Sequence, residues 1–149
     1  MPRDEIERTF AGLTGSDYEI TSPATPAYNC AAWAAGDTAR CWDPPPGGGN
    51  YWPTEVPCAL SLPNLVTAFA TLGYSPCGTS DLEPGFEKLA LYVGEQGEPT
   101  HVARQLPSGV WTSKLGTAED IEHGRLAGLE GQIYGRVAHF LRRPRPAPQ

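Results

Sequence analysis

Cys30 and His101 are the two residues whose types and settings best suit catalysis. Asn29, a favoured N-cap residue, precedes Cys30, and the helix-forming run AAWAA at residues 31–35 follows it and is closed by Gly36. The sequence therefore predicts that Cys30 opens a helix, where oriented N–H groups and the helix dipole lower the pKa of a thiol and favour the nucleophilic thiolate. His101, on a predicted strand far downstream, would supply the general base.

The strand that carries His101 is predicted from a hairpin pattern. Residues 100–106 and 110–115 flank the loop Pro107-Ser108-Gly109, whose length and glycine are typical of a β-hairpin. If Leu106 pairs with Val110, alternation along the strands places six side chains on one face: His101, Ala103, Gln105, Trp111, Ser113 and Leu115. Ser113 is then diagonal to His101, and it is our candidate for the group that orients the imidazole ring.

Two further helices are predicted in the first half of the chain. Residues 4–13 carry Ile6, Phe10 and Leu13 at the spacing of one buried helical face. Residues 61–72 begin with a serine that can cap a helix and are followed by Gly73, a typical stop. Both helices precede the predicted sheet in the chain.

The second half of the chain is predicted to supply the sheet. The apolar run LALYV at residues 89–93 is typical of a central strand that is covered on both faces. Thr117, with Asp120 three residues later, resembles a capping box and predicts a short helix that runs toward His123. Residues 134–141 are predicted to form the last strand.

A cysteine at a helix start, followed far downstream by a histidine that opens a β-hairpin, resembles the layout of the papain-like cysteine hydrolases, in particular their small bacterial amidase and endopeptidase members. The resemblance is carried by YNCAAW at residues 28–33, LALYV at 89–93 and THVAR at 100–104. It implies an α+β fold in which N-terminal helices pack on a small antiparallel β-sheet.

The same resemblance implies a mechanism. Cys30 would be the nucleophile, His101 the general base and acid, and an amide or peptide substrate would acylate the enzyme. Ser113 takes the position of the residue that orients the catalytic histidine. Asn29, Trp33 and Gln105 are candidates for contacts with the substrate or its oxyanion. Hydrolysis and acyl or amide transfer share this first half-reaction.

Each of these residues also has a structural interpretation. Cysteine is among the most buried residue types, so Cys30 could be a small core residue, and His101 could be an ordinary strand histidine. The aromatic, Pro- and Gly-rich stretch at residues 40–53 and the hairpin would then form a binding surface. The competing prediction is a non-catalytic interaction module whose partner is a protein. His123 has two interpretations, a second site residue or a surface histidine.

Composition limits the remaining possibilities. At 149 residues the chain is predicted to form one domain over residues 1–141, followed by a basic, Pro-rich tail at 142–149 that we expect to be extended. A net charge of −6 disfavours nucleic acid as a partner. No apolar run predicts a membrane segment, and the four irregularly spaced cysteines predict neither a metal site nor another cofactor. We expect a cytoplasmic protein, and signal-independent secretion stays open as an alternative.

Overall fold

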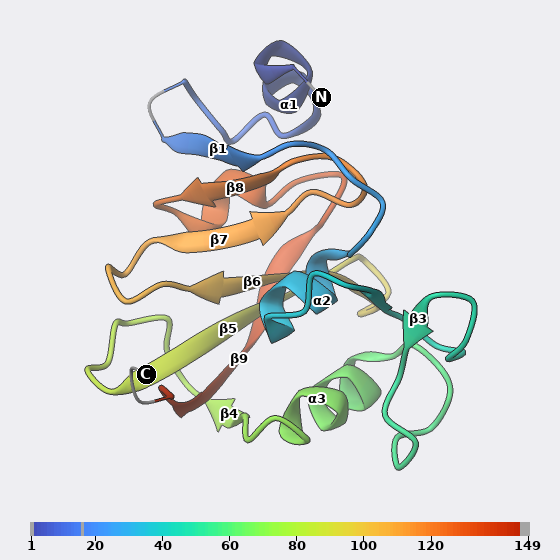
Figure 1. Ribbon diagram of the computed structural model, residues 1–149. Coiled ribbons are helices and arrows are strands. Elements are labelled where there is room, and N and C mark those ends of the chain that lie inside the picture. Colours follow the sequence, from blue (N-terminus) through green and yellow to red (C-terminus); the bar gives the residue numbers. More distant parts are fainter. Residues whose placement is uncertain (1, 16, 147–149) are drawn as a thin grey trace.

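A seven-stranded antiparallel sheet dominates the computed structural model, which describes residues 2–15 and 17–146 (Figure 1). Its strand order is β1-β8-β7-β6-β5-β9-β4, and every neighbouring pair is antiparallel. The strands are β1 (Tyr18–Ser22), β4 (Ser75–Cys77), β5 (Phe86–Val93), β6 (Pro99–Gln105), β7 (Trp111–Lys114), β8 (Asp120–His123) and β9 (Arg136–Pro144).

The helices are short. They are α1 (Arg3–Thr9), α2 (Cys30–Ala35), α3 (Leu62–Ala70) and the 3-10 helix η1 (Leu126–Leu129). A separate parallel pair, β2 (Cys41–Trp42) and β3 (Asn50–Tyr51), lies in the aromatic, Pro- and Gly-rich stretch at residues 40–53. Trp42 and the neighbouring Trp52 are buried in the core, so this stretch is pinned to the domain by its aromatic rings.

The prediction of an α+β, papain-like fold with N-terminal helices on a small sheet is wrong. The sheet has seven strands, one at residues 18–22 and six between residues 75 and 144, whereas the three α-helices have seven, six and nine residues. The sequence pattern underestimated the sheet because three of its strands, the edge strands β1 and β4 and the inner strand β8, are short and carry polar residues. Such strands form through pairing with partners far away in the sequence rather than through a local apolar pattern.

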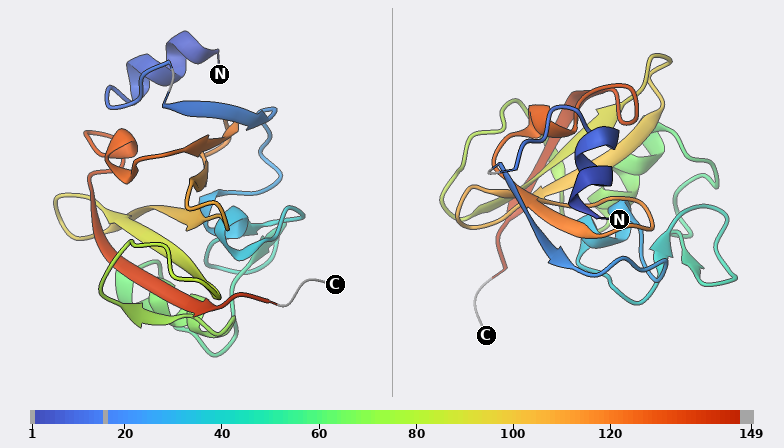
Figure 2. Two further views of the ribbon diagram at one scale, coloured as in Figure 1. Left: turned by 90° about the vertical axis from the view of Figure 1, so that its left-hand side faces the viewer. Right: turned by 90° about the horizontal axis from the view of Figure 1, so that it is seen from above.

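The sheet has an apolar core on each face. The first core joins α2 and α3 to Leu89, Leu91 and Val102. The second core joins the N-terminal segment and η1 to Ala90, Tyr92 and other residues of the opposite face. In the left-hand view of Figure 2, α2 and η1 accordingly lie on opposite sides of the sheet. This two-sided burial explains the continuous apolar run of β5.

Several local predictions are confirmed. Asn29 caps α2 by accepting a hydrogen bond from the Ala32 N–H, and Gly36 ends this helix in the left-handed region at φ 83°. Ser61 caps α3. The hairpin register is also correct over the two pairs that the ladder contains, Arg104 with Thr112 and Gln105 with Trp111.

Two predictions in the second half of the chain are wrong. Residues 120–123 form β8 and not a helix, because they pair with β7 on one side and β1 on the other. The last strand, β9, continues to Pro144, past the expected domain end at residue 141. Arg142 and Arg143 of the expected tail pair with Lys88 and Glu87 of β5. Residues 147–149 of that tail lie outside the described residues.

Candidate functional site

Cys30 is the first residue of α2, and Asn29 fixes its position. The Asn29 Oδ1 accepts hydrogen bonds from the N–H groups of Ala32 and Trp42, both at 3.0 Å. Its Nδ2 donates to the Trp42 carbonyl oxygen at 3.0 Å. One side chain therefore caps α2 and ties it to β2. This amide makes three hydrogen bonds, so Asn29 acts as a positioning residue for Cys30 rather than as a free oxyanion donor.

The sulfur of Cys30 lies in a setting that favours the neutral thiol. Burial raises the pKa of the Cys30 thiol, and the backbone N–H groups of Val102 and Ala31 lower it without outweighing burial. The positive charge of Lys114 acts in the same direction as the N–H groups. The structure thus differs from the expected low pKa, because α2 is only six residues long and its first turn is largely covered. These N–H groups nevertheless favour negative charge on the sulfur.

His101 is enclosed by two tyrosine rings. Its ring stacks on Tyr134 with centroids 4.2 Å apart and planes 11° apart, and it meets Tyr92 edge-on at 5.2 Å. The residue is 1% exposed, and neither ring nitrogen has a hydrogen-bond partner in the described part of the chain. Burial, with a smaller contribution from the charge of His123, holds the pKa of His101 well below its usual value. The imidazole is therefore neutral at pH 7.

Cys30 and His101 line one pocket but do not touch through a hydrogen bond. The α2 pocket, of about 70 Å³, wraps the first residues of β6, and its lining includes Asn29, Cys30, Leu65, Thr100 and His101. Val102 packs with α2 in the first core, so strand alternation directs the side chain of its neighbour His101 to the opposite face. The two candidate groups thus approach the pocket from the two sides of β6.

Ser113 is placed beside a different histidine. Its Oγ lies 2.8 Å from Nε2 of His123, and Nδ1 of His123 lies 3.1 Å from the Arg125 carbonyl oxygen. Ser113 and His123 are 0% and 1% exposed. Burial lowers the pKa of His123 to about 4. Ser113 therefore holds His123 in the second core, and it does not orient His101 in this structure.

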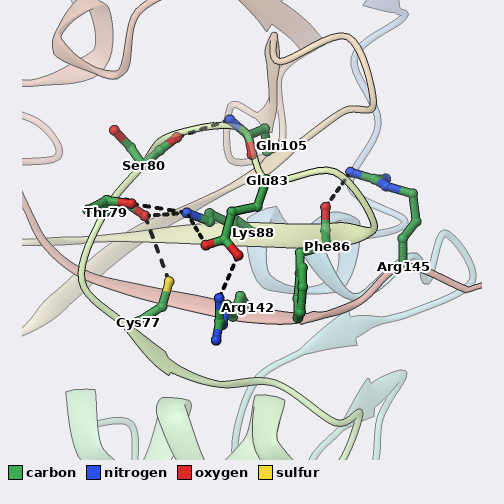
Figure 3. Close-up of polar contacts among 9 residues, drawn as sticks. All are labelled: Cys77, Thr79, Ser80, Glu83, Phe86, Lys88, Gln105, Arg142 and Arg145. Atoms are coloured by element: carbon green, nitrogen blue, oxygen red, sulfur yellow. Dashed lines mark hydrogen bonds and ion pairs between the residues drawn. The ribbon is translucent and has the colours of Figure 1, made fainter.

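Trp33 and Gln105 lie outside the α2 pocket. Trp33 donates from Nε1 to the Thr112 Oγ1 at 2.9 Å and stacks on Tyr28, which locks α2 onto β7. Gln105 donates from Nε2 to the Ser80 carbonyl oxygen at 3.1 Å, as Figure 3 shows, while its Oε1 is buried and unpartnered. Both side chains position neighbouring segments.

A buried polar cluster that was not predicted from the sequence holds the segment before Cys30. Lys114 donates from Nζ to the carbonyl oxygens of Thr25, Gly116 and Ala118 at 2.8, 2.6 and 2.5 Å. Asp120 accepts a 2.7 Å hydrogen bond from the hydroxyl of Tyr28, whose pKa burial raises to about 12. The sequence signal for this cluster is the pair of charged residues itself. Lys114 lies in the strand predicted at residues 110–115 and Asp120 lies at the predicted helix start, and charges that become buried require partners.

No group of three or more histidine, cysteine, aspartate or glutamate side chains suited to a metal occurs within residues 2–15 and 17–146. Over the same residues, no helix has the length and apolar character that crossing a bilayer requires.

A comparison with family models matches residues 19–142 to a family described as "Domain of unknown function (DUF7689)". The match begins inside β1 and ends inside β9, so it covers at least part of every strand of the sheet and all residues that line the α2 pocket. No curated protein and no solved structure matches the chain.

Proposed function

The chain belongs to the DUF7689 family, and we propose that it is a cysteine-dependent enzyme that transfers or hydrolyses an acyl group of an amide or peptide at the α2 pocket. Cys30 is the nucleophile and His101 is the base in this proposal. The observation that carries it is that a cysteine and a buried histidine, far apart in the sequence, line one small pocket, and that neither histidine ring nitrogen has a hydrogen-bond partner among the described residues. Unpartnered buried imidazole nitrogens destabilise a fold, and such a cost is typical of functional sites.

The setting of the sulfur supports the same chemistry. Backbone N–H groups of Val102 and Ala31 lower the pKa of the thiol, and they would stabilise negative charge on the sulfur or on the oxyanion of a tetrahedral intermediate. The Lys114 ammonium group adds a positive charge at longer range. The two N–H groups belong to the backbone of α2 and β6, so they need no reorganisation during the reaction.

The reaction starts from a neutral pair. The raised pKa of Cys30 favours a neutral thiol, and the lowered pKa of His101 favours a neutral imidazole. The thiol proton passes to His101 as the sulfur attacks the carbonyl carbon, and the imidazolium then protonates the leaving amine. Water or a second amine resolves the thioester. This step requires the His101 ring to reach the sulfur from its place between Tyr92 and Tyr134.

We include a cytoplasmic location in the proposal. The four cysteines are free thiols, and the cytoplasm keeps thiols reduced, as a cysteine nucleophile requires.

The proposal is tested by acylation with p-nitrophenyl acetate, with the acetylated cysteines identified by peptide mass spectrometry. Cys58 is exposed and serves as the internal reference for an ordinary thiol. We expect Cys30 to be acetylated at least tenfold faster than Cys58 at pH 7.5. His101→Gln should reduce this rate to that of Cys58, whereas His139→Gln, a matched change on β9, should leave it unaltered.

Equal or slower acetylation of Cys30 in the wild-type protein would contradict the proposal. The chain would then fit the competing function, a non-catalytic interaction module that binds a protein partner. Alkylation by iodoacetamide between pH 6 and 10 gives a separate readout. Because the pKa of Cys30 is raised, we expect half-maximal labelling of Cys30 at a higher pH than for the thiol of a short peptide.

A further inference from the structure

Arg104 of β6 forms no ion pair within residues 2–15 and 17–146. Its guanidinium lies over the ring of Trp33, with the central carbon 5.6 Å from the ring centroid. Its Nε is buried without a hydrogen-bond partner in the described part of the chain, and its neighbours in the sheet, Leu89 and Thr112, are uncharged. A buried guanidinium nitrogen normally has a hydrogen-bond partner.

The other cations at this end of the sheet are paired. Lys88 and Arg142 share the carboxylate of Glu83, at 3.1 and 2.6 Å, as Figure 3 shows. Arg143 and Arg145 share the carboxylate of Glu87, at 2.9 and 3.3 Å. Arg104 therefore differs from these neighbouring cations, each of which forms an ion pair with a carboxylate.

The neighbouring arginines place Arg104 at the edge of a positive cluster. The charges of Arg104 and Arg143 both act on the Glu87 carboxylate and on the Tyr74 hydroxyl. Arg143 and Arg145 contact the Glu87 carboxylate, and Arg104 lies opposite Leu89, two residues further along β5, so three guanidinium charges face one carboxylate charge in this part of the sheet and two positive charges are left over. Arg104 and Trp33 are partly exposed, and the side chains of Arg143 and Arg145 are 20% and 23% exposed, so solvent reaches the cluster.

We propose that Arg104, together with Arg143 and Arg145, binds the phosphate group of a small phosphate monoester, with Trp33 supporting the plane of the Arg104 guanidinium. Two negative charges on the phosphate match the two uncompensated charges. A guanidinium that stacks on an aromatic ring keeps its N–H edge free for two parallel hydrogen bonds to oxygens. The site lies beyond the α2 pocket on β6, and it does not depend on the chemistry proposed for Cys30.

The proposal is tested by thermal unfolding of the full chain in inorganic phosphate, with sodium chloride adjusted to keep ionic strength constant. We expect a saturable rise in Tm, about 3–6 °C at a phosphate concentration of ten times Kd. Acetate, with a single charge, should bind at least tenfold more weakly. Phenyl phosphate compares a monoester with the free ion, and binding at least as tight as that of inorganic phosphate supports a monoester ligand.

Arg104→Gln should abolish the phosphate-dependent rise, and Arg104→Lys should weaken binding because the lysine cannot form the two-pronged contact. Arg125→Gln is the matched control, since this arginine is 64% exposed and lies at the other end of the sheet. A direct readout is the NMR resonance of the Arg104 Nε–H group, which should shift saturably with phosphate in the wild-type protein. This titration decides the question even if Arg104→Gln does not fold.

Equal Tm increases in the wild type and Arg104→Gln would overturn the proposal, as would an Arg104 Nε–H resonance that phosphate does not move. Equal effects of acetate and phosphate would also overturn it, because general screening or any singly charged anion would then be enough to explain the rise in Tm. Loss of acylation at Cys30 bears only on the proposed enzyme and leaves this site unaffected.

Discussion

The Oγ of Ser113 lies 2.8 Å from Nε2 of His123 on the neighbouring strand. This contact assigns the serine to the stability of the second core and separates it from His101. It also distinguishes two roles that the sequence could not separate, because a serine on this face of β7 could reach either histidine.

Ser113→Ala should therefore reduce stability without changing the chemistry at Cys30. Loss of the hydrogen bond leaves a buried ring nitrogen unpartnered, which costs about 1–3 kcal/mol. Chemical denaturation measures this cost, and Ser75→Ala, on an exposed position of β4, is the control and should be nearly neutral. A large drop in acetylation of Cys30 in folded Ser113→Ala would instead support a catalytic role for Ser113.

As the pH falls, the protein should begin to lose stability at a higher pH than protonation of its carboxylates alone would cause. The folded-state pKa values of His101 and His123 lie below that of an unfolded histidine, so the unfolded chain binds more protons below about pH 6.5. Their stabilising effect is complete above this pH and is lost as the pH falls toward the folded-state values. His123, with a pKa of about 4, should account for a loss of roughly 2 kcal/mol between pH 7 and pH 5.

Urea unfolding at pH 7, 6 and 5 measures this dependence. Carboxylates titrate mainly below this range, so they contribute little to the slope. His123→Gln should flatten the curve relative to the wild type, whatever its effect on stability at pH 7. An unchanged slope in this variant would show that His123 does not resist protonation.

His101→Phe should stabilise the fold or leave it unchanged. The phenyl ring can keep the stack on Tyr134 and the contact with Tyr92, and it removes two buried nitrogens that have no partner in the described residues. We expect a gain of about 1 kcal/mol, in contrast to most core substitutions, which destabilise. His101→Ala should cost stability because it leaves a cavity.

Denaturation curves of the two variants and the wild type provide the measurement. A loss of more than about 1 kcal/mol in His101→Phe would mean that the imidazole nitrogens contribute hydrogen bonds to the fold. A gain in stability together with a loss of acetylation at Cys30 would be typical of a functional residue that the fold tolerates at a cost.

Truncation after Leu141 should destabilise the sheet strongly. It removes the pairing of Arg142, Arg143 and Pro144 with β5, and it leaves the buried Glu87 without both of its arginine partners. Burial alone would raise the pKa of Glu87, but hydrogen bonds from Tyr74 and Arg143 lower it, so the carboxylate is ionised at pH 7. Breaking a buried ion pair costs about 3–5 kcal/mol.

The control for this truncation is a chain that ends after Pro146, which keeps every residue of β9. It should unfold at nearly the wild-type temperature in circular dichroism. Equal melting temperatures for the two truncated chains would indicate that the end of β9 contributes nothing to stability.

Elements with local signals were predictable from the sequence. Asn29 and Gly36 bound α2, Ser61 starts α3, and the loop at residues 107–109 sets the register of β6 and β7. In each case the capping or turn residue lies within a few positions of the element that it shapes. The information is therefore contained in a short stretch of chain.

Long-range relationships were not predictable in the same way. Tyr18 pairs with His123, and this pairing draws residues 120–123 into a strand although Thr117 and Asp120 resemble a helix start. For the candidate site, the hairpin register indicates which side chains share a face with His101 but not which face α2 covers. Val102 faces α2, so Cys30 and His101 approach the pocket from different sides.

The strand order also has a consequence for synthesis on the ribosome. β5 lies between β6 and β9, so its apolar residues lack a neighbour on one side until residues 136–144 have been made. β1 likewise cannot pair with β8 until residues 120–123 have been made. Contacts between distant segments slow folding and expose unpaired strand edges during it. The nascent chain is therefore expected to need protection from aggregation until almost all of its sheet has been translated.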